Sequence, residues 1–403
     1  MGSSSSKGSV KAEYLKLVQR QKLLYAQKHP SISSAPRLLD WRIEVYQEVQ
    51  AAARAVPWAS WPAALQSLLE NWDILIDERW KSSLLWHDYL CACQLQRKAI
   101  GATTRSTLAV PLPTEPTADS AGLVDFLRTH LEAEKTNAVS ALIATFAREF
   151  SSFYALNPAS ELPYELAIDI TDEQDLKKVT KEVHLFVSLC LDAFLAYYKG
   201  VDLTQLLGSL VEVKDLIMER IFSYPVAEVL IMVFRAADEE KQSQVDAKVA
   251  SYSHLTCEDL GVEPLFCLDR PRTDGTRSHG YDKVVTCLRS LPLSRSPMSK
   301  LQVIVRSTRL VCECIDDYWE VDPTVDKDQL VVNADQILSI YFYAVLKARV
   351  QGLGAHLRLM LEFLRKEVKQ STMGYYLSTV EASLENVARL DEAFLTALRS
   401  HNV

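Results

Sequence analysis

The sequence predicts an all-α protein. Apolar residues recur at three- and four-residue spacing along most of the 403-residue chain, which is the spacing of helices with one buried face. Segments that alternate like strands are rare, and only 12 residues are glycine. The chain is long enough for one large core or for two or three smaller ones. We therefore expect an N-terminal helical region, a helical bundle and a further helical domain, in that order.

Residues 1–30 are predicted to form a basic tail and helix that associates with a membrane from the cytosolic side. The first six residues, MGSSSS, fit the acceptor pattern for myristoylation on Gly2. One acyl chain binds membranes only marginally, so a second signal is needed. Six lysines and arginines between positions 7 and 28 would supply it by attracting anionic lipids. The same residues also fit a disordered tail or an expression remnant followed by a solvated basic helix, and the sequence leaves these alternatives open.

The next segments are predicted from tryptophan, proline and helical spacing. Six of the seven tryptophans lie between Trp41 and Trp86. Tryptophans at helical spacing are typical of a core rather than of a ligand cage. Residues 31–100 are therefore predicted to be a Trp-rich helical region. Residues 101–120 are rich in threonine and proline and are predicted to be a linker. A helical bundle is predicted over residues 121–245, with helices at 123–153, 172–200, 203–222 and 225–236.

Residues 246–395 are predicted to form a separate helical domain. Thr256 and Gly261 have the types expected at the start and the end of a short helix, and a polar loop follows at 268–281. Ser296-Pro297 marks another helix start, with serine as the N-cap and proline at the first helical position.

The centre of this domain is predicted to lie in the helix at 335–346. After an acidic linker at 322–332, this stretch is apolar nearly all round, which indicates a buried helix. A further helix at 357–364 precedes Gly374 and a pair of tyrosines.

Composition argues against several functions. The net charge of −8 is unfavourable for a nucleic-acid binder, which needs a basic face. The eight cysteines contain no C-x-x-C pair, and the two C-x-C pairs fall in helical patterns, where alternate residues point about 200° apart. We expect reduced thiols in a cytoplasmic protein, with no metal and no cofactor. Phosphate-binding, nucleophile-elbow and zinc-protease motifs are absent, so a metabolic enzyme is not supported.

Two segments 40 residues apart carry the candidate site. Asp335 opens the buried helix, and Tyr375 and Tyr376 follow Gly374. Taken alone, each has an ordinary structural explanation. A carboxylate at a helix start is a cap worth about 1 kcal/mol, and a tyrosine pair is aromatic core with hydrogen-bonded hydroxyls.

The order of these motifs along the chain indicates a functional role as well. Ser296-Pro297-x-x-Lys300-Leu301, then Ala334-Asp335 before an apolar helix ending in Val345-Leu346-Lys347, then Gly374-Tyr375-Tyr376-Leu377, resembles the VPS9 (vacuolar protein sorting 9) domain. That family consists of guanine nucleotide exchange factors for the Rab-5 branch of small GTPases. The resemblance covers residues 250–392 and implies a layered helical domain supported by the preceding bundle.

The resemblance also implies roles for individual residues. Asp335 matches the aspartate of the family's A-D-[E/D] motif, which enters the nucleotide site of the GTPase and pairs with its phosphate-binding lysine. Tyr375 matches the tyrosine of G-Y-Y-x-T, which packs against the switch region. Further contacts to the GTPase are expected from Asn333, Ser339, Tyr376 and Ser378. No covalent chemistry is implied, and the expected setting is endocytic vesicle traffic at endosomal membranes.

Two positions depart from the family's pattern. Ser339 stands where proline is common, and Ser378 stands where threonine is common. A second function therefore stays open, namely a membrane-tethered helical adaptor that binds a small GTPase without exchanging its nucleotide.

Overall fold

The computed structural model describes residues 173–197, 209–271, 278–320 and 325–401, together with Gly275 and single positions between 131 and 154. The predictions for Gly2, for residues 1–30, for the Trp-rich region at 31–100 and for the linker at 101–120 lie outside the described residues. The described residues fall into two compact units, which divide between Val229 and Leu230. Every regular element in these ranges is a helix, which confirms the all-α prediction.

The first unit contains α8 (Glu173–Tyr197) and α10 (Ser209–Phe222), which pack against each other, and the start of α11 (Val226–Ala237). Helix α8 begins one residue after the predicted start. Its buried Phe186 stacks on Phe146 with ring centroids 3.8 Å apart. The buried hydroxyl of Tyr154 donates a hydrogen bond to the Glu182 carboxylate at 2.7 Å, so a charged group in this core has a partner.

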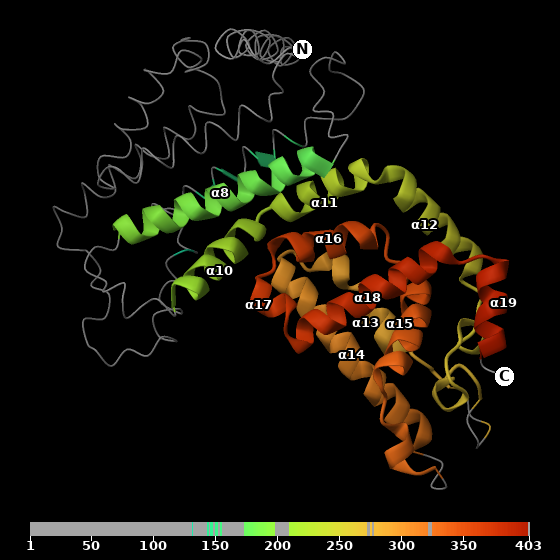
Figure 1. The fold of residues 1–403 in the computed structure, drawn as a ribbon. Coiled ribbons are helices and arrows are strands. Elements are labelled where there is room, and N and C mark those ends of the chain that lie inside the picture. Colours follow the sequence, from blue (N-terminus) through green and yellow to red (C-terminus); the bar gives the residue numbers. More distant parts are fainter. Residues whose placement is uncertain are drawn as a thin grey trace, which may run out of the picture. The chain divides into compact units, whose positions relative to one another are not determined.

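The second unit is built from helices of very different lengths (Figure 1). In chain order they are α12 (Glu239–Tyr252), η2 (Glu258–Leu260), η3 (Pro264–Phe266), α13 (Asp282–Arg289), η4 (Leu291–Leu293), α14 (Pro297–Trp319), η5 (Lys327–Leu330), α15 (Ala334–Ala348), α16 (Leu353–Phe363), α17 (Lys366–Lys369), α18 (Thr372–Arg389) and α19 (Glu392–His401). The sequence patterns did not indicate α12, α13, α17, α18 or α19.

Three of the predicted capping positions can be compared directly with the structure. Ser296 caps α14 as predicted, because its Oγ accepts a hydrogen bond from the Ser299 amide at 3.1 Å. Element η2 begins after Cys257, one residue later than predicted. Thr256 still caps it, because its Oγ accepts a hydrogen bond from the Asp259 amide at 3.3 Å, while the Asp259 carboxylate accepts from the Thr256 amide and hydroxyl. Gly261 ends the element with a left-handed φ of 75°, as predicted.

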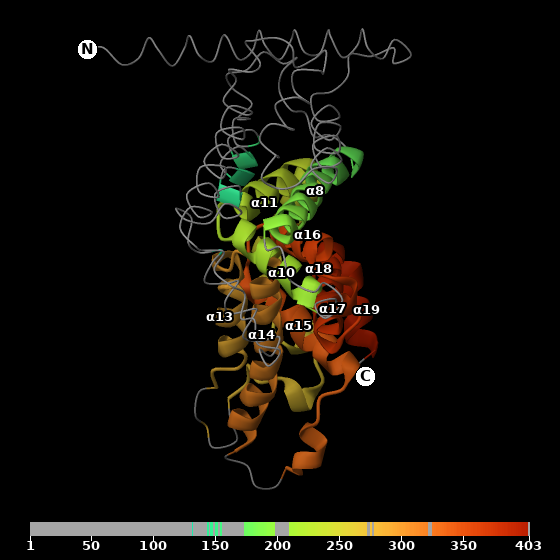
Figure 2. The same ribbon diagram turned by 90° about the vertical axis from the view of Figure 1, so that its left-hand side faces the viewer.

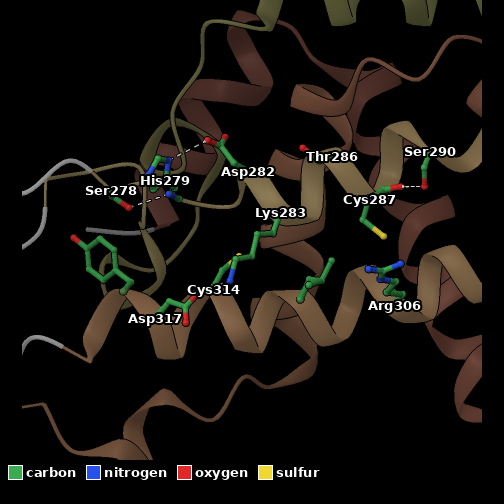
Figure 3. Close-up of a pocket in the computed structure, with 13 residues that line it drawn as sticks. Ser278, His279, Asp282, Lys283, Thr286, Cys287, Ser290, Arg306, Cys314 and Asp317 are labelled. Atoms are coloured by element: carbon green, nitrogen blue, oxygen red, sulfur yellow. Dashed lines mark hydrogen bonds and ion pairs between the residues drawn. The ribbon is translucent and has the colours of Figure 1, made fainter.

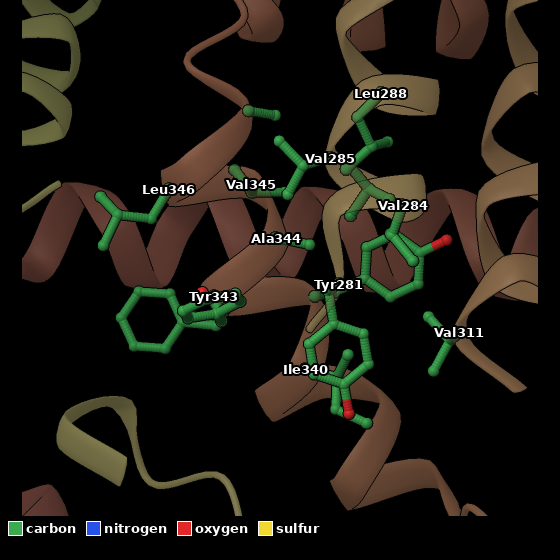
Figure 4. Packing of buried hydrophobic residues seen from close by; sticks show 14 of the residues in the cluster. Tyr281, Val284, Val285, Leu288, Val311, Ile340, Tyr343, Ala344, Val345 and Leu346 are labelled. Carbon is green, nitrogen blue, oxygen red and sulfur yellow. The ribbon is translucent and has the colours of Figure 1, made fainter. Parts of the chain in front are cut away.

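Helix α15 occupies the centre of the second unit, as its all-round apolar sequence predicts. Ile340, Tyr341 and Leu346 are fully buried in it. Figure 4 shows Ala344 and Val345 of α15 beside the apolar side chains of α13. The Tyr341 hydroxyl lies 2.6 Å from Ser307 Oγ of α14, which satisfies this polar group inside the core.

Helices α15 and α18 lie side by side in both ribbon views (Figures 1 and 2). This contact brings the two candidate segments of the sequence onto neighbouring helices. None of the helices in the described ranges is both long and apolar enough to cross a membrane.

Candidate functional site

Asn333, not Asp335, caps the central helix α15. Its side-chain oxygen accepts hydrogen bonds from the amides of Asp335 (3.0 Å) and Gln336 (2.9 Å), and the Gln336 side chain accepts one from the Asn333 amide (2.8 Å). This reciprocal capping box satisfies the amides that an isolated helix start leaves unpaired. The structural explanation of Asp335 as a cap is therefore wrong, because its carboxylate does not pair with the amides of the helix start.

The Asp335 side chain is exposed in the first turn of α15. Within the described parts of the chain, its carboxylate makes no hydrogen bond or ion pair. It sits in the first turn, beside the positive end of the helix dipole. The buried side chains of Ile337 and Ile340 anchor the same helix in the core. The arrangement is an exposed carboxylate on a helix start whose backbone is held by the cap and by the core.

Ser339 adds a hydrogen bond within this start. Its Oγ donates to the carbonyl oxygen of Asp335 at 3.1 Å. In a regular α-helix the amide of residue 339 bonds to the same carbonyl, and a proline has no amide hydrogen to donate. With serine at position 339, the backbone hydrogen bond from its amide to the Asp335 carbonyl is able to form. The proline that is common in the family at this position would remove that bond.

Gly374 lies inside the first turn of α18 and allows that helix to start against α17. A Cβ atom on this residue would stand 1.9 Å from the carbonyl oxygen of Lys369, far inside any real contact. Ser371 caps the helix, because its Oγ accepts a hydrogen bond from the Met373 amide at 3.2 Å. Glycine is thus required here by close backbone approach rather than by a turn.

The two tyrosines that follow have different environments. The Tyr375 side chain is 43% exposed, whereas Tyr376 is half-buried and packs against the core. Their ring centroids are 5.6 Å apart, with the planes tilted by 59°. The buried-aromatic explanation therefore applies in part to Tyr376 and fails for Tyr375, which presents its ring to solvent. Ser378 is also exposed.

Tyr376 stands near the start of α18, the helix that packs against α15. Burial raises the pKa of Tyr341, in the second turn of α15, to about 12. Asp335 and Tyr375 stand on the first turns of these adjoining helices, and a direct approach of their side chains stays a prediction.

Two residues near Asp335 were missed by the sequence reasoning. Gln336 stands at the third position of A-D-[E/D], where the motif has an acid, and its amide donates to the carboxylate of Glu263 at 2.9 Å. The two positions are 73 residues apart, so no sequence spacing links them. Val331, just before the cap, is 73% exposed.

A groove of about 690 Å³ lies elsewhere in the same unit, between α13 and α14 (Figure 3). An ion pair between Lys283 and Asp317 crosses it at 2.5 Å. Burial raises the pKa of the Cys287 thiol in its wall, so this cysteine is not an activated nucleophile. None of the site residues predicted from the sequence lines this groove.

The cysteine pair on α14 faces two directions, as its spacing predicts. Cys312 is exposed and Cys314 is buried. In the described part of the chain, no group of three or more histidine, cysteine, aspartate or glutamate side chains is arranged to hold a metal ion.

Comparison with known proteins identifies the domain that carries this site. Residues 281–392 match the model of the vacuolar sorting protein 9 (VPS9) domain. The human protein named VPS9 domain-containing protein 1 is 24% identical over 223 residues, which are 54% of this chain and 35% of the human protein. The chain thus spans about a third of that relative's length. The match confirms the resemblance to the VPS9 domain over residues 281–392.

Proposed function

We propose that this protein is a guanine nucleotide exchange factor that promotes release of GDP from a Rab-5-branch GTPase. The observation that supports this most is the Asp335 carboxylate, which is exposed on the capped first turn of α15 inside the VPS9 domain. Asn333 already caps this helix, so the Asp335 carboxylate is not needed to pair its free amides, and its remaining structural role is the favourable contact with the helix dipole.

The physical basis is competition for the phosphate site. A GTPase holds its nucleotide largely through Mg²⁺ and a lysine that contacts the phosphates. A carboxylate that pairs with this lysine replaces one of those contacts and disfavours Mg²⁺ in its usual place. The barrier to release then falls without any covalent step and without a cofactor of the exchange factor. Because Asp335 is held on a rigid helix, little conformational entropy is lost when it enters the site.

Tyr375 is proposed to provide the accompanying apolar contact. Its exposed ring is able to bury area against the switch region at a low entropic cost, which is typical of aromatic anchors at interfaces. Ser339, Ser378, Asn333 and Tyr376 flank these two residues, and we propose them as further contacts. Asn333 and Tyr376 also have structural roles, in the cap and in the core respectively.

The direct test is the release of a fluorescent GDP analogue from purified Rab GTPases, from the Rab-5 branch and from other branches. Asp335→Ala is expected to lower the stimulated rate by roughly 10²-fold, the scale of one lost charged group in an active site. Asp328→Ala is the matched control, because Asp328 is an exposed acid in the preceding element η5. Absence of stimulated release from every GTPase tested, or equal rates for both variants, would overturn the proposal.

An adaptor without exchange activity is the second candidate, and Ser339 is the observation that favours it. The regularly bonded first turn of α15 differs from the proline-containing start common in the family. In that case the GTPase would bind tightly without faster nucleotide release, and binding would persist in the Asp335→Ala variant.

We extend the proposal to the place of action, the cytoplasmic face of endosomal membranes. Gly2 would carry a myristoyl group, and the basic residues up to position 28 would add the electrostatic attraction. Labelling with a myristate analogue in cells should mark the wild-type protein and leave Gly2→Ala unlabelled. Equal labelling of both would exclude Gly2 as the acceptor.

A further inference from the structure

The first turn of α15 is tied to a distant segment through one side chain. Gln336 uses both ends of its amide group. Its oxygen accepts from the Asn333 amide at 2.8 Å, and its nitrogen donates to the Glu263 carboxylate at 2.9 Å. The oxygen completes the helix cap, while the nitrogen reaches the turn before η3, 73 positions earlier in the chain.

The backbone around Glu263 is held in place by buried neighbours and by hydrogen bonds. Val262 before it is 2% exposed, and the Glu263 carbonyl accepts a hydrogen bond from the amide of the fully buried Phe266 at 2.8 Å. The same turn is bound to the end of α14, because the Trp319 indole donates to the carbonyl oxygen of Leu265 at 3.0 Å. The carboxylate is therefore presented from a backbone whose position is fixed on two sides.

We propose that Glu263 is a positioning residue for nucleotide exchange. By holding Gln336, it fixes the exposed side of the turn that carries Asp335, while the core fixes the buried side. The inference rests on the proposed function of Asp335. A charged group acts efficiently in a partner's site only when its direction is already set by supporting contacts. Glu263 would affect exchange through this support and would not itself touch the nucleotide.

The hydrogen bond between Gln336 and Glu263 has a fixed donor and a fixed acceptor, and this makes the positioning role testable. A carboxylate only accepts hydrogen bonds, whereas an amide both donates and accepts. Gln336 is therefore able to join the Asn333 amide to the Glu263 carboxylate, and a glutamate at position 336 would face a like charge. Exchanging the two side chains restores the match. In the double variant Glu263→Gln/Gln336→Glu, the new glutamate accepts from both the Asn333 amide and the new glutamine, and the net charge stays as in the wild type.

The experiment measures stimulated GDP release against the concentration of the full-length protein, for Glu263→Ala, Gln336→Glu and the double variant. Both single variants are expected to lower the maximal release rate roughly tenfold, with the half-saturating concentration little changed. The double variant should return the rate to within about twofold of the wild type. Wild-type rates in the single variants, or a double variant as slow as Gln336→Glu, would overturn the proposal. The second result would mean that Glu263 contacts the GTPase directly.

A second measurement separates this inference from the proposed function. Hydrogen–deuterium exchange of the peptide covering residues 330–340 needs no GTPase. It should become faster in Gln336→Glu and return to the wild-type rate in the double variant. If the wild type stimulates no GTPase, the proposed function fails whatever this peptide does. If the wild type is active and the peptide exchanges equally in all variants, only the positioning role fails.

Discussion

The side-chain oxygen of Asn333 accepts a hydrogen bond from the backbone amide of Asp335, 3.0 Å away. The helix start and the proposed exchange residue are thus coupled. We expect Asn333→Ala to lower the free energy of unfolding by about 1 kcal/mol, the typical cost of a lost N-cap. Asn333→Asp, which keeps an acceptor, should lose much less. Chemical denaturation of both variants checks this, and equal destabilisation would show that the cap is not what Asn333 provides.

Gly374 predicts an unusual sensitivity to a single methyl group. Gly374→Ala would place a Cβ 1.9 Å from the Lys369 carbonyl oxygen, so α17 and α18 must separate. We expect a loss of roughly 1–3 kcal/mol of stability or more, together with slower nucleotide release.

The matched control for that variant is Gly354→Ala, in the first turn of α16. The new Cβ there would meet the flexible end of Gln242 at 3.3 Å, which is able to move. Alanine also favours the helix by about 1 kcal/mol relative to glycine. Thermal unfolding should therefore separate the two alanine variants clearly, and similar melting temperatures would contradict the contact.

His356 makes the stability of the second unit depend on pH. Burial lowers the pKa of this histidine from 6.5 to about 3, and the nearby charges of Lys300 and Arg235 act in the same direction. The folded protein therefore resists a proton that the unfolded chain accepts below pH 6.5. Stability should be fully present above pH 6.5 and should fall by on the order of 2 kcal/mol between pH 6.5 and pH 5.

Urea denaturation at several pH values measures this loss. His356→Gln removes the titrating group, so its stability should change less over the same pH range. A wild type and a variant with parallel pH profiles would show that other groups dominate acid destabilisation.

The neighbouring tyrosines should separate binding from stability. Tyr375→Ala is expected to weaken GTPase binding strongly and to leave the melting temperature nearly unchanged, because the side chain is 43% exposed. Tyr376→Ala should instead lower stability by roughly 1–3 kcal/mol, since this ring packs against the core. Titration of a Rab GTPase and thermal unfolding, run on both variants, check the assignment. A destabilised Tyr375→Ala would indicate a structural ring.

The predictability of the fold differs from helix to helix for physical reasons. Helices α14 and α15 were evident because their start signals and apolar faces lie in short, contiguous stretches. Helix α12 was missed because its sequence is largely polar and Val245 is its one buried residue. Element η2 begins one residue later than predicted, while Thr256 still pairs with Asp259 inside it.

In the candidate site, too, some features could be predicted from the sequence and others could not. Asp335 and Tyr375 could be found from motif order, since both match a family pattern. The true cap could not be chosen from spacing alone, because Asn333 and Asp335 are both good capping residues two positions apart. The bond between Glu263 and Gln336 depends on tertiary contact across 73 positions and has no local signal.

The two bonds of Gln336 also imply an order of events during folding. The cap connects residues only three positions apart, so it closes a very short loop and is able to form while the rest of the chain is still unfolded. The bond to Glu263 closes a much longer loop and must wait until the core has assembled. Loss of the cap should therefore slow folding if this turn belongs to the nucleus, whereas loss of the Glu263 bond should mainly speed unfolding.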